Sequence, residues 1–128
     1  MRLLLDTHAF LWWATDTARL SHEVRQCCEN ADNRVLLSVA SVWEMQIKMQ
    51  SRRLVLRCTL AELVEKQCRE NNVRLVPIEL AHVLKLDELP ARHKDPFDRL
   101  IVAQAIVEGL TVASTDKVIA QYPIRILW

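Results

Sequence analysis

Short, unbroken apolar runs alternate with amphipathic segments along the whole chain, and this alternation constrains the fold more than any other feature. The apolar runs have the length of strands. Leu3–Leu5 contains no polar residue, which is typical of a strand that is buried on both faces. The segments between these runs have apolar residues at helical spacing. Strands that alternate with helices predict an α/β fold with a parallel sheet.

The expected elements can be placed by residue. We expect strands at residues 3–5, 35–37, 74–78, 111–113 and 124–128. We expect helices near residues 10–14, 21–29, 41–49, 59–68 and 80–84, and a longer helix from 95 that ends before Gly109. These elements predict a three-layer α/β/α fold with a central, mainly parallel five-stranded sheet. Because the chain has 128 residues, we expect a single domain, residues 1–128.

Glycine and cysteine usage excludes several classes of site. Gly109 is the only glycine, whereas a loop that cradles phosphate or a dinucleotide needs several glycines at fixed spacing. The four cysteines form no Cys-x-x-Cys pair, which argues against a zinc or redox motif. Cys27 and Cys28 share helical spacing with Val24 and Ala31, so we expect them in the core.

Charge and hydropathy indicate a globular protein outside the membrane. The formal net charge is +1 and the mean hydropathy is +0.03. No apolar stretch approaches the roughly 20 residues that span a bilayer, and the first residues lack the long apolar segment of a signal peptide. We therefore expect a cytoplasmic protein. A near-neutral charge is compatible with nucleic-acid binding only through a local basic rim.

Four acidic residues lie where an expected strand gives way to a helix: Asp6, Glu44, Asp98 and Asp116. The carboxyl ends of parallel strands share one edge of the sheet, where ligands bind. Carboxylates that meet there repel one another unless a cation holds them. Oxygen ligands of this kind suit Mg²⁺ or Mn²⁺. The pattern therefore predicts a metal-dependent hydrolase.

Each acid also has an explanation that needs no catalysis. Asp6 and Asp116 are each able to cap a following helix, and Ser41 to Glu44 has the spacing of a capping box. A charge at Asp98 favours the helix dipole. Four such coincidences at one sheet edge are less probable than one shared site. Asp95 precedes a proline, and for this residue we favour capping.

Hydroxyl groups near the acids are candidates for orienting them. We expect Thr7, Ser41 and Ser114 to act in this way, with Ser38 as an alternative cap for the helix that contains Ser41. The histidines do not show metal-ligand spacing, and no nucleophile elbow is present.

Four segments carry a resemblance to a known family. They are residues 1–8 MRLLLDTH, 38–44 SVASVWE, 93–105 HKDPFDRLIVAQA and 114–116 STD. Together they resemble the PIN-domain ribonucleases, in particular the VapC-type toxins of prokaryotic toxin–antitoxin pairs. Ser114 stands where the family more often has threonine, and residues 49–54 lack a glycine that is often found there.

The resemblance implies a PIN-like fold and an endoribonuclease activity. Asp6, Glu44, Asp98 and Asp116 would bind Mg²⁺ or Mn²⁺, and metal-activated water would cleave a structured RNA such as tRNA or rRNA. The expected partners are the RNA, a cognate antitoxin and a second copy of the chain in a homodimer. A basic rim for RNA phosphates would include Lys48, Lys94, Arg99 and Lys117.

Two alternatives remain open at this stage. A PIN-fold RNA-binding or scaffold domain without turnover would keep the fold but has no reason to retain all four acids. A phosphatase of the haloacid-dehalogenase kind also has an aspartate after its first strand. Its chemistry needs a second aspartate two positions on, where this chain has His8.

Overall fold

Five parallel strands form the centre of the molecule. The computed structural model describes residues 1–128, and the strands are β1 (Arg2–Leu5), β2 (Arg34–Ser38), β3 (Arg74–Val76), β4 (Thr111–Ala113) and β5 (Arg125–Leu127). Their order in the sheet is β3-β2-β1-β4-β5, and every neighbouring pair is parallel. The prediction of a five-stranded parallel sheet in an α/β fold is confirmed.

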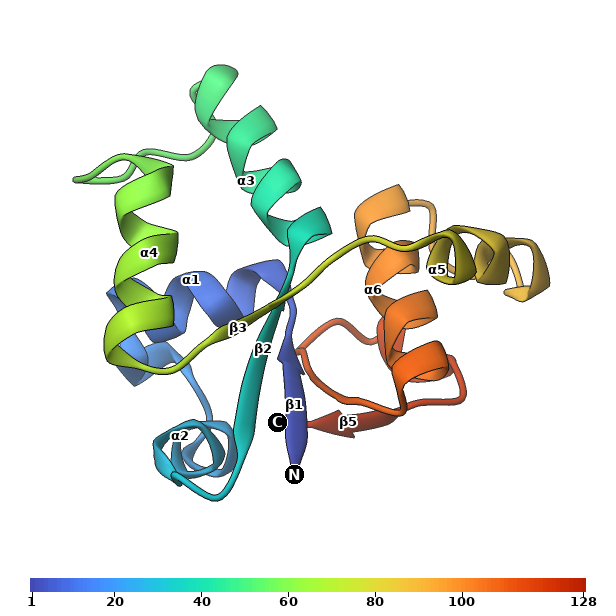
Figure 1. Cartoon of the computed structure of the whole chain (residues 1–128). Helices are drawn as coiled ribbons and strands as arrows, with labels where there is room; N and C mark the ends of the chain where they lie inside the picture. The colour runs from blue at the N-terminus through green and yellow to red at the C-terminus, as the bar shows by residue number, and fades with distance from the viewer.

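Helices connect the strands. They are α1 (Thr7–Thr15), α2 (His22–Glu29), α3 (Val39–Gln50), α4 (Leu60–Glu70), α5 (Leu80–Lys85) and α6 (Pro96–Glu108). Three short 3₁₀ turns complete the set: η1 (Thr17–Arg19), η2 (Leu86–Glu88) and η3 (Ile119–Gln121). Figure 1 shows the sheet between two groups of helices, with α1, α2 and α4 on one side and α5 and α6 on the other.

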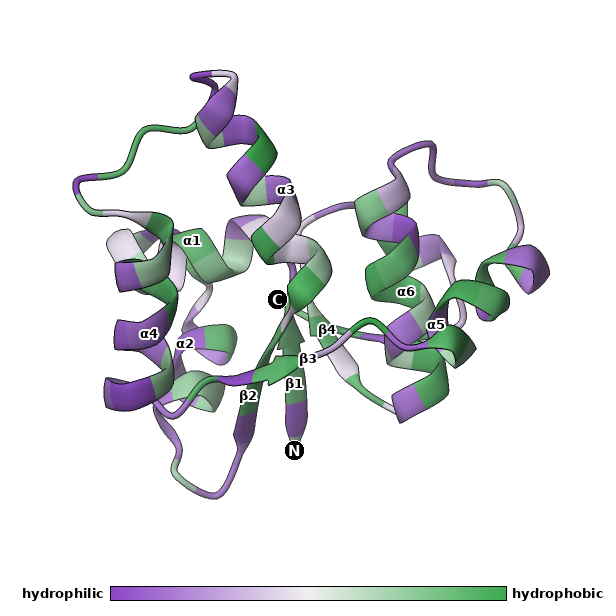
Figure 2. Cartoon of the chain, turned by 45° about the horizontal axis from the view of Figure 1, so that its top comes forward, coloured by the Kyte–Doolittle hydropathy of each residue, from purple (hydrophilic) through white to green (hydrophobic).

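The two faces of the sheet build two separate apolar cores. Leu3, Leu5 and Leu37 face the side of α1, α2 and α4, where they are buried with Phe10 and Val24. The intervening residues of the strands point to the opposite face. There Leu4 and Val112 pack with Ile101 and Ala105 of α6. The central strands are coloured hydrophobic along most of their length (Figure 2), as expected for strands covered on both faces.

Several helix boundaries differ from the prediction. Helix α1 begins at Thr7 rather than near Phe10, because Asp6 caps it and accepts a hydrogen bond from the Ala9 amide at 2.8 Å. Helix α3 begins at Val39 because Ser38, and not Ser41, is its N-cap. The strand expected at residues 74–78 ends at Val76, before Pro77, where proline removes a backbone donor.

The expected cap residues of the other helices are in place. Thr59 accepts a hydrogen bond from the Glu62 amide at 3.1 Å at the start of α4. Gly109 ends α6 with a φ of 67°, a left-handed conformation that favours glycine. At the end of α3 the chain has no glycine, and Arg52 itself adopts a φ of 61°. None of the helices has the length and apolar character of a membrane span.

Candidate active site

The carboxyl edge of the sheet brings the predicted acids together. The chain builds outwards from β1 through β2 to β3 and then returns to β4 on the other side of β1. The order of strands therefore reverses between β1 and β4, and ligands of open α/β sheets bind at such a switch point. Asp6 follows β1 and Ser114 follows β4, and the Asp6 amide donates to the Ala113 carbonyl at 3.1 Å.

Asp6 is buried at the switch point. Its side chain is both the N-cap of α1 and a hydrogen-bond partner of Ser114, and the residue is only 6% exposed. Burial raises the pKa of Asp6 above its ordinary value, and the hydrogen bonds from Ser114 and Ala9 oppose this increase. The capping explanation for Asp6 is thus correct, but capping does not remove its carboxylate from the cluster.

Glu44 reaches the same place from α3. Its Oε1 accepts a hydrogen bond from Oγ1 of Thr7 at 2.6 Å, and its Oε2 lies 2.8 Å from Nζ of Lys48. Because Ser38 caps α3, Glu44 is more than one turn inside the helix and is not part of a capping box. The alternative explanation for Glu44 is therefore wrong. Thr7 fixes one oxygen and Lys48 neutralises the other.

Asp95 and Asp98 have different roles at the start of α6: Asp95 caps the helix, and Asp98 lies in the acidic cluster. Oδ1 of Asp95 accepts hydrogen bonds from the Phe97 and Asp98 amides at 2.8 and 3.3 Å, so Asp95 is the N-cap, as predicted. Asp98 makes no capping bond. Burial raises the pKa of Asp98 to about 7, and the negative charge of Asp95 contributes. The charges of Glu44 and Asp6 raise it further, which indicates that these carboxylates share one electrostatic environment.

Asp116 lies in the turn after β4. Its Oδ1 accepts hydrogen bonds from the Val118 and Ile119 amides at 2.7 and 3.3 Å, and its own amide donates to Oγ of Ser114 at 3.0 Å. Burial acts to raise the pKa of Asp116, but the hydrogen bond from His93 and those from the two amides outweigh it. The pKa of Asp116 is therefore below its ordinary value, and this carboxylate is charged at neutral pH.

His93 joins Asp98 to Asp116, and sequence analysis did not assign it to the site. Its Nε2 lies 2.8 Å from Oδ2 of Asp116 and 3.2 Å from Oδ2 of Asp98. Its Nδ1 accepts a hydrogen bond from the Asp95 amide at 3.1 Å, so in the neutral ring Nε2 carries the proton. Burial lowers the pKa of His93, but the hydrogen bond to Asp116 and the charges of the nearby aspartates raise it overall.

The donor set fits a divalent cation. His93, Asp98 and Asp116 each offer a ligand atom within 4.8 Å of the others, and the buried carboxylates of Asp6 and Glu44 adjoin them. Two nitrogen donors of the chain, Nζ of Lys48 and Nε2 of His93, already bind oxygens of this cluster. Crowded carboxylates therefore attract positive partners even within the chain itself. A set of mostly carboxylate oxygens is typical of hard metal ions.

The remaining predicted residues lie at different distances from this cluster. Ser41 is fully buried one turn before Glu44, and its hydroxyl has no hydrogen-bond partner in the protein. Lys94 and Lys117 are exposed and adjoin His93 and Asp116 in sequence. Arg99 donates to the Leu86 carbonyl at 3.0 Å, so its guanidinium points toward η2.

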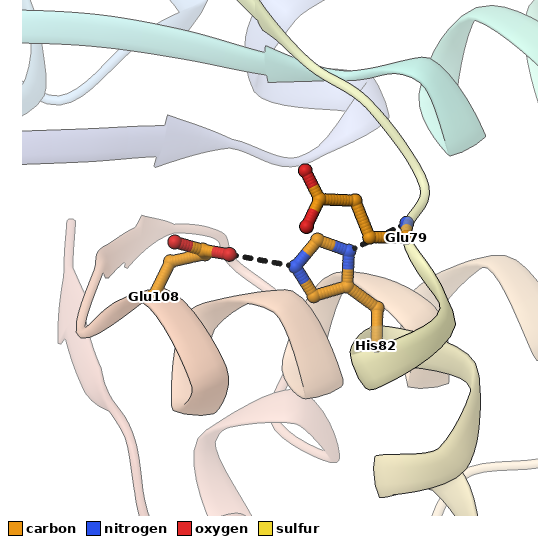
Figure 3. A group of neighbouring side chains, drawn as sticks. All are labelled: Glu79, His82 and Glu108. Carbon is orange, nitrogen blue, oxygen red and sulfur yellow. Dashed lines mark hydrogen bonds and ion pairs between the residues drawn. The ribbon is translucent and has the colours of Figure 1, made fainter.

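A second histidine–carboxylate group is structural in character. Figure 3 shows His82 between Glu79 and Glu108. The Nδ1 of His82 accepts a hydrogen bond from the Glu79 amide at 3.0 Å, and its Nε2 lies 2.9 Å from Oε1 of Glu108. Both ring nitrogens are thus engaged, and His82 is 1% exposed. The group closes a capping box at the start of α5 and ties that helix to the end of α6.

Fold and site together define an α/β protein with clustered carboxylates at the switch point of a parallel sheet. Residues 3–124 match the PIN domain family. The chain therefore belongs to the PIN-domain family. It is 30% identical to Ribonuclease VapC22 of Mycobacterium tuberculosis over 116 residues, which are 90% of this chain and 87% of that protein. This relationship confirms the predicted membership of the VapC-type PIN-domain ribonucleases.

Solved structures share the fold at low sequence identity. VapBC2 from Rickettsia felis, bound to a promoter DNA fragment, superposes with a TM-score of 0.72 at 13% identity, covering 99% of this chain and 98% of that one. DNA-bound VapBC from Salmonella typhimurium gives a TM-score of 0.70 at 15% identity, covering 99% and 97%. VapBC-5 from Mycobacterium tuberculosis, a member of the VapBC family of toxin–antitoxin systems, gives a TM-score of 0.63 at 15% identity. The match covers 98% of this chain and 97% of that one.

Proposed function

We propose that this chain is a metal-dependent endoribonuclease and the toxin of a toxin–antitoxin pair. The observation that carries the proposal is the convergence of Asp6, Glu44, Asp98 and Asp116 on the switch point of the sheet. They come from four different elements, so helix capping alone does not explain why they meet. The relationship to Ribonuclease VapC22 supports RNA as the substrate.

The four carboxylates would hold Mg²⁺ or Mn²⁺, and Asp98 and Asp116 each lie within hydrogen-bonding distance of Nε2 of His93. A bound ion of this kind lowers the pKa of water to make a nucleophile and stabilises the charge that grows on phosphate. The oxygen-rich donor set supports Mg²⁺ or Mn²⁺ as the ion, because these ions prefer carboxylates over nitrogen and sulfur ligands.

Neighbouring groups would keep the carboxylates in place. Thr7 binds one oxygen of Glu44 and Ser114 binds Asp6, so each hydroxyl fixes the rotation of an acid from a different element. Burial limits the number of water molecules at Asp6 and Glu44, both 6% exposed. Burial and neighbouring charges raise the pKa of Asp98 to about 7, so a cation bound at this carboxylate would have to displace its proton.

The RNA would approach across the more exposed side of the cluster. The side chain of Asp116 is 32% exposed and that of Asp98 is 19% exposed, and the exposed amines of Lys94 and Lys117 flank them in sequence. Lys48 is already at the cluster. Arg99 would have to leave the Leu86 carbonyl to contact RNA. We expect a structured RNA such as tRNA or rRNA, whose unpaired loops present a flexible backbone.

Two protein partners belong to the proposal. A cognate antitoxin is supported by the structural neighbours, whose crystals contain toxin–antitoxin complexes. A homodimer is supported by exposed apolar side chains outside the core: Trp43 is 56% exposed, Leu80 72% and Leu84 61%. Leu80 and Leu84 are four residues apart on one face of α5, and a contiguous exposed apolar surface often marks an interface between proteins. Sedimentation of the purified chain, with and without the antitoxin, measures both associations.

The decisive experiment is to map RNA ends after brief expression of the chain. We expect new 5′-phosphate ends at one or a few positions in a structured RNA, because water attacks the phosphorus and leaves a 3′-hydroxyl. The purified protein should make the same cuts with Mn²⁺ and none with EDTA. Cuts that persist in EDTA would contradict the metal requirement, and the lack of any new ends would contradict the nuclease.

Growth tests the biological part of the proposal. We expect expression of this chain to slow bacterial growth, and co-expression of the antitoxin to restore it. The Asp98→Asn variant is the matched control, because it differs from wild type by one charge at a proposed metal ligand and should not slow growth. Normal growth with soluble, active wild-type enzyme would identify a PIN-domain nuclease that is not a toxin.

A further inference from the structure

A groove beside the acidic cluster is lined by basic residues, of which only Lys48 has a role in the proposed function. It is a cavity of about 790 Å³ bounded by α1, η1, the end of α3, the segment 51–59 and α4. This volume is within the range of roughly 300–1,000 Å³ that is typical of ligand sites. Figure 1 shows the segment that joins α3 to α4 extending away from the body of the molecule before it returns to α4.

The charge of this groove is entirely positive. Arg19, Lys48, Arg53, Arg57 and Lys66 line it, together with His8, and no aspartate or glutamate does. We call these five residues and the cavity between them the basic groove. Only Lys48 forms an ion pair, with Glu44. The other four cations are exposed and form no ion pair, so their charge is available to an anion.

The basic groove shares Lys48 with the candidate active site. Lys48 lines the groove and lies 2.8 Å from Glu44 in the acidic cluster. His8 lines the groove and is two residues from Asp6. A polyanion with one phosphate at the acidic cluster would therefore have its next phosphates beside a row of cations. The acids repel phosphate, and these cations are able to offset that repulsion.

The groove also offers surfaces for bases. Trp12 and the apolar side chains of residues 54–56 line it, and Figure 2 colours much of this segment hydrophobic. The guanidinium of Arg19 lies 4.9 Å from the centre of the Trp12 ring, which holds a phosphate-binding group next to an aromatic surface. Cations along the backbone combined with apolar and aromatic surfaces for the bases are typical of sites for single-stranded nucleic acid.

We propose that the basic groove binds the phosphate backbone of single-stranded RNA on one side of the bond that is cut. This proposal rests on the proposed nuclease function for the identity of the polymer. An acidic protein segment would satisfy the same charges. RNA is favoured because Lys48 of the groove contacts Glu44 at the site where a phosphodiester would lie, and because the positive charge of the groove extends over at least three elements, as a polymer backbone requires.

The first test measures binding without catalysis. A labelled single-stranded RNA of about twelve nucleotides, the length that such sites cover, is titrated by fluorescence anisotropy in EDTA at low salt. We expect Arg53→Gln/Arg57→Gln to weaken binding about tenfold and to reduce the slope of log K against log salt by about 1.4, since each lost phosphate contact removes about 0.7. Arg19→Gln/Lys66→Gln should weaken binding to the same extent. Because these two residues lie outside the segment 51–59, this second variant tests the groove even if the first variant disturbs that segment.

The matched control removes the same charge from the opposite edge of the sheet. Arg34 and Arg74 are exposed at the starts of β2 and β3 and line none of this groove. Arg34→Gln/Arg74→Gln should leave both the affinity and its salt slope close to wild type. If Arg34→Gln/Arg74→Gln weakens binding as much as the groove variants do, the effect is one of net charge and the proposal is wrong.

The second test separates the groove from the chemistry. With Mn²⁺, the groove variants should cut a long RNA with a raised KM, while their rate on a dinucleotide, which is too short to follow the groove, should equal that of wild type. If no RNA is cut by any variant but the groove variants still lose binding, the nuclease proposal fails and the groove proposal stands. If an acidic peptide of equal charge binds the wild-type groove more tightly than RNA, the occupant is a protein segment and the proposal is overturned.

Discussion

Nε2 of His93 donates a hydrogen bond to Oδ2 of Asp116 at 2.8 Å, and the acceptor is 23 residues further along the chain. This bond spans the segment before α6 and the turn after β4, so it closes one side of the acidic cluster. Because the same nitrogen lies 3.2 Å from Asp98, a metal ion that binds both aspartates has to compete with the ring. The affinity for metal therefore depends on how readily His93 moves or changes its partner.

The first prediction separates Asp98 from Asp95. Asp98→Asn should reduce RNA cleavage by at least about a hundredfold, because even groups that only orient metal ligands contribute 10–100-fold. Asp95→Asn carries the same change of charge and should stay within several-fold of wild type, because asparagine caps helices as well as aspartate. Cleavage rates and Mn²⁺ titration calorimetry measure the two effects. Equal losses in both variants would place Asp95 among the ligands.

The second prediction concerns stability without metal. The pKa of Asp98 is about 7 in the folded protein and that of Asp6 is also raised, whereas both are near 4 in an unfolded chain. Between these values the folded state holds protons that the unfolded state has released, so stability falls as pH rises. In EDTA, we expect the free energy of unfolding to be lower at about pH 8 than at about pH 5, by on the order of a few kcal/mol. The Tm should be lower at the higher pH as a result.

The matched variant for this effect is Asp98→Asn. It has no proton to lose at that position, so its Tm should decline less between the same two pH values. Mn²⁺ should reverse the wild-type trend, because metal binding favours the charged carboxylates. A decline in Asp98→Asn that is as steep as in wild type would assign the pH dependence to other groups.

The third prediction tests the Thr7–Glu44 hydrogen bond. Thr7→Val keeps the shape of the side chain but leaves a buried carboxylate oxygen without its partner at 2.6 Å. We expect a loss of about 1–3 kcal/mol in the free energy of unfolding and a reduced cleavage rate, with Thr7→Ser restoring both. Urea denaturation and single-turnover cleavage provide the measurements. If Thr7→Ser cleaves as slowly as Thr7→Val, the hydroxyl is not what positions Glu44.

The fourth prediction concerns the end of α6. Gly109 has a φ of 67°, and a Cβ atom there would meet no other atom within 4 Å. Gly109→Ala should therefore cost about 1 kcal/mol through backbone strain alone, and Gly109→Asn should cost less because asparagine tolerates this conformation. Urea denaturation ranks the three proteins. If alanine and asparagine have the same cost, the loss does not arise from the left-handed backbone.

Sequence predicted the order of elements because each strand contains a short apolar run and most helices carry a cap signal. Asp95-Pro96 and Thr59 are examples, and both caps are where expected. The predicted start of a helix was less accurate where two residues were both able to act as its N-cap. Ser38 and Ser41 are both suitable N-cap residues. Ser38 is the N-cap of α3 because β2 ends directly at it.

The candidate site was predictable only in part. Carboxylates at strand ends have a sequence signal, since the position after a parallel strand fixes the edge on which they lie. His93 has no such signal, because its contact with Asp116 depends on how the segment 89–95 packs over η3. There the Tyr122 hydroxyl accepts a hydrogen bond from the His93 amide at 2.9 Å. The sequence shows that His93 is close to Asp95, but it does not show that the His93 side chain points toward Asp116.

The place of β4 in the sheet has a consequence for how the protein is made. β4 is the fourth strand along the chain, yet it pairs with β1, the first, and it brings Asp116 to the cluster. Domains emerge from the ribosome with the N-terminal part first, at roughly 5–20 residues per second. A nascent chain can form β1, β2 and β3 early, but it lacks its last carboxylate until the C-terminal residues are released. Under the proposed function, in which Asp116 is a metal ligand, the chain would not cut RNA while most of it is still being synthesised, and a cognate antitoxin would have that interval in which to bind it.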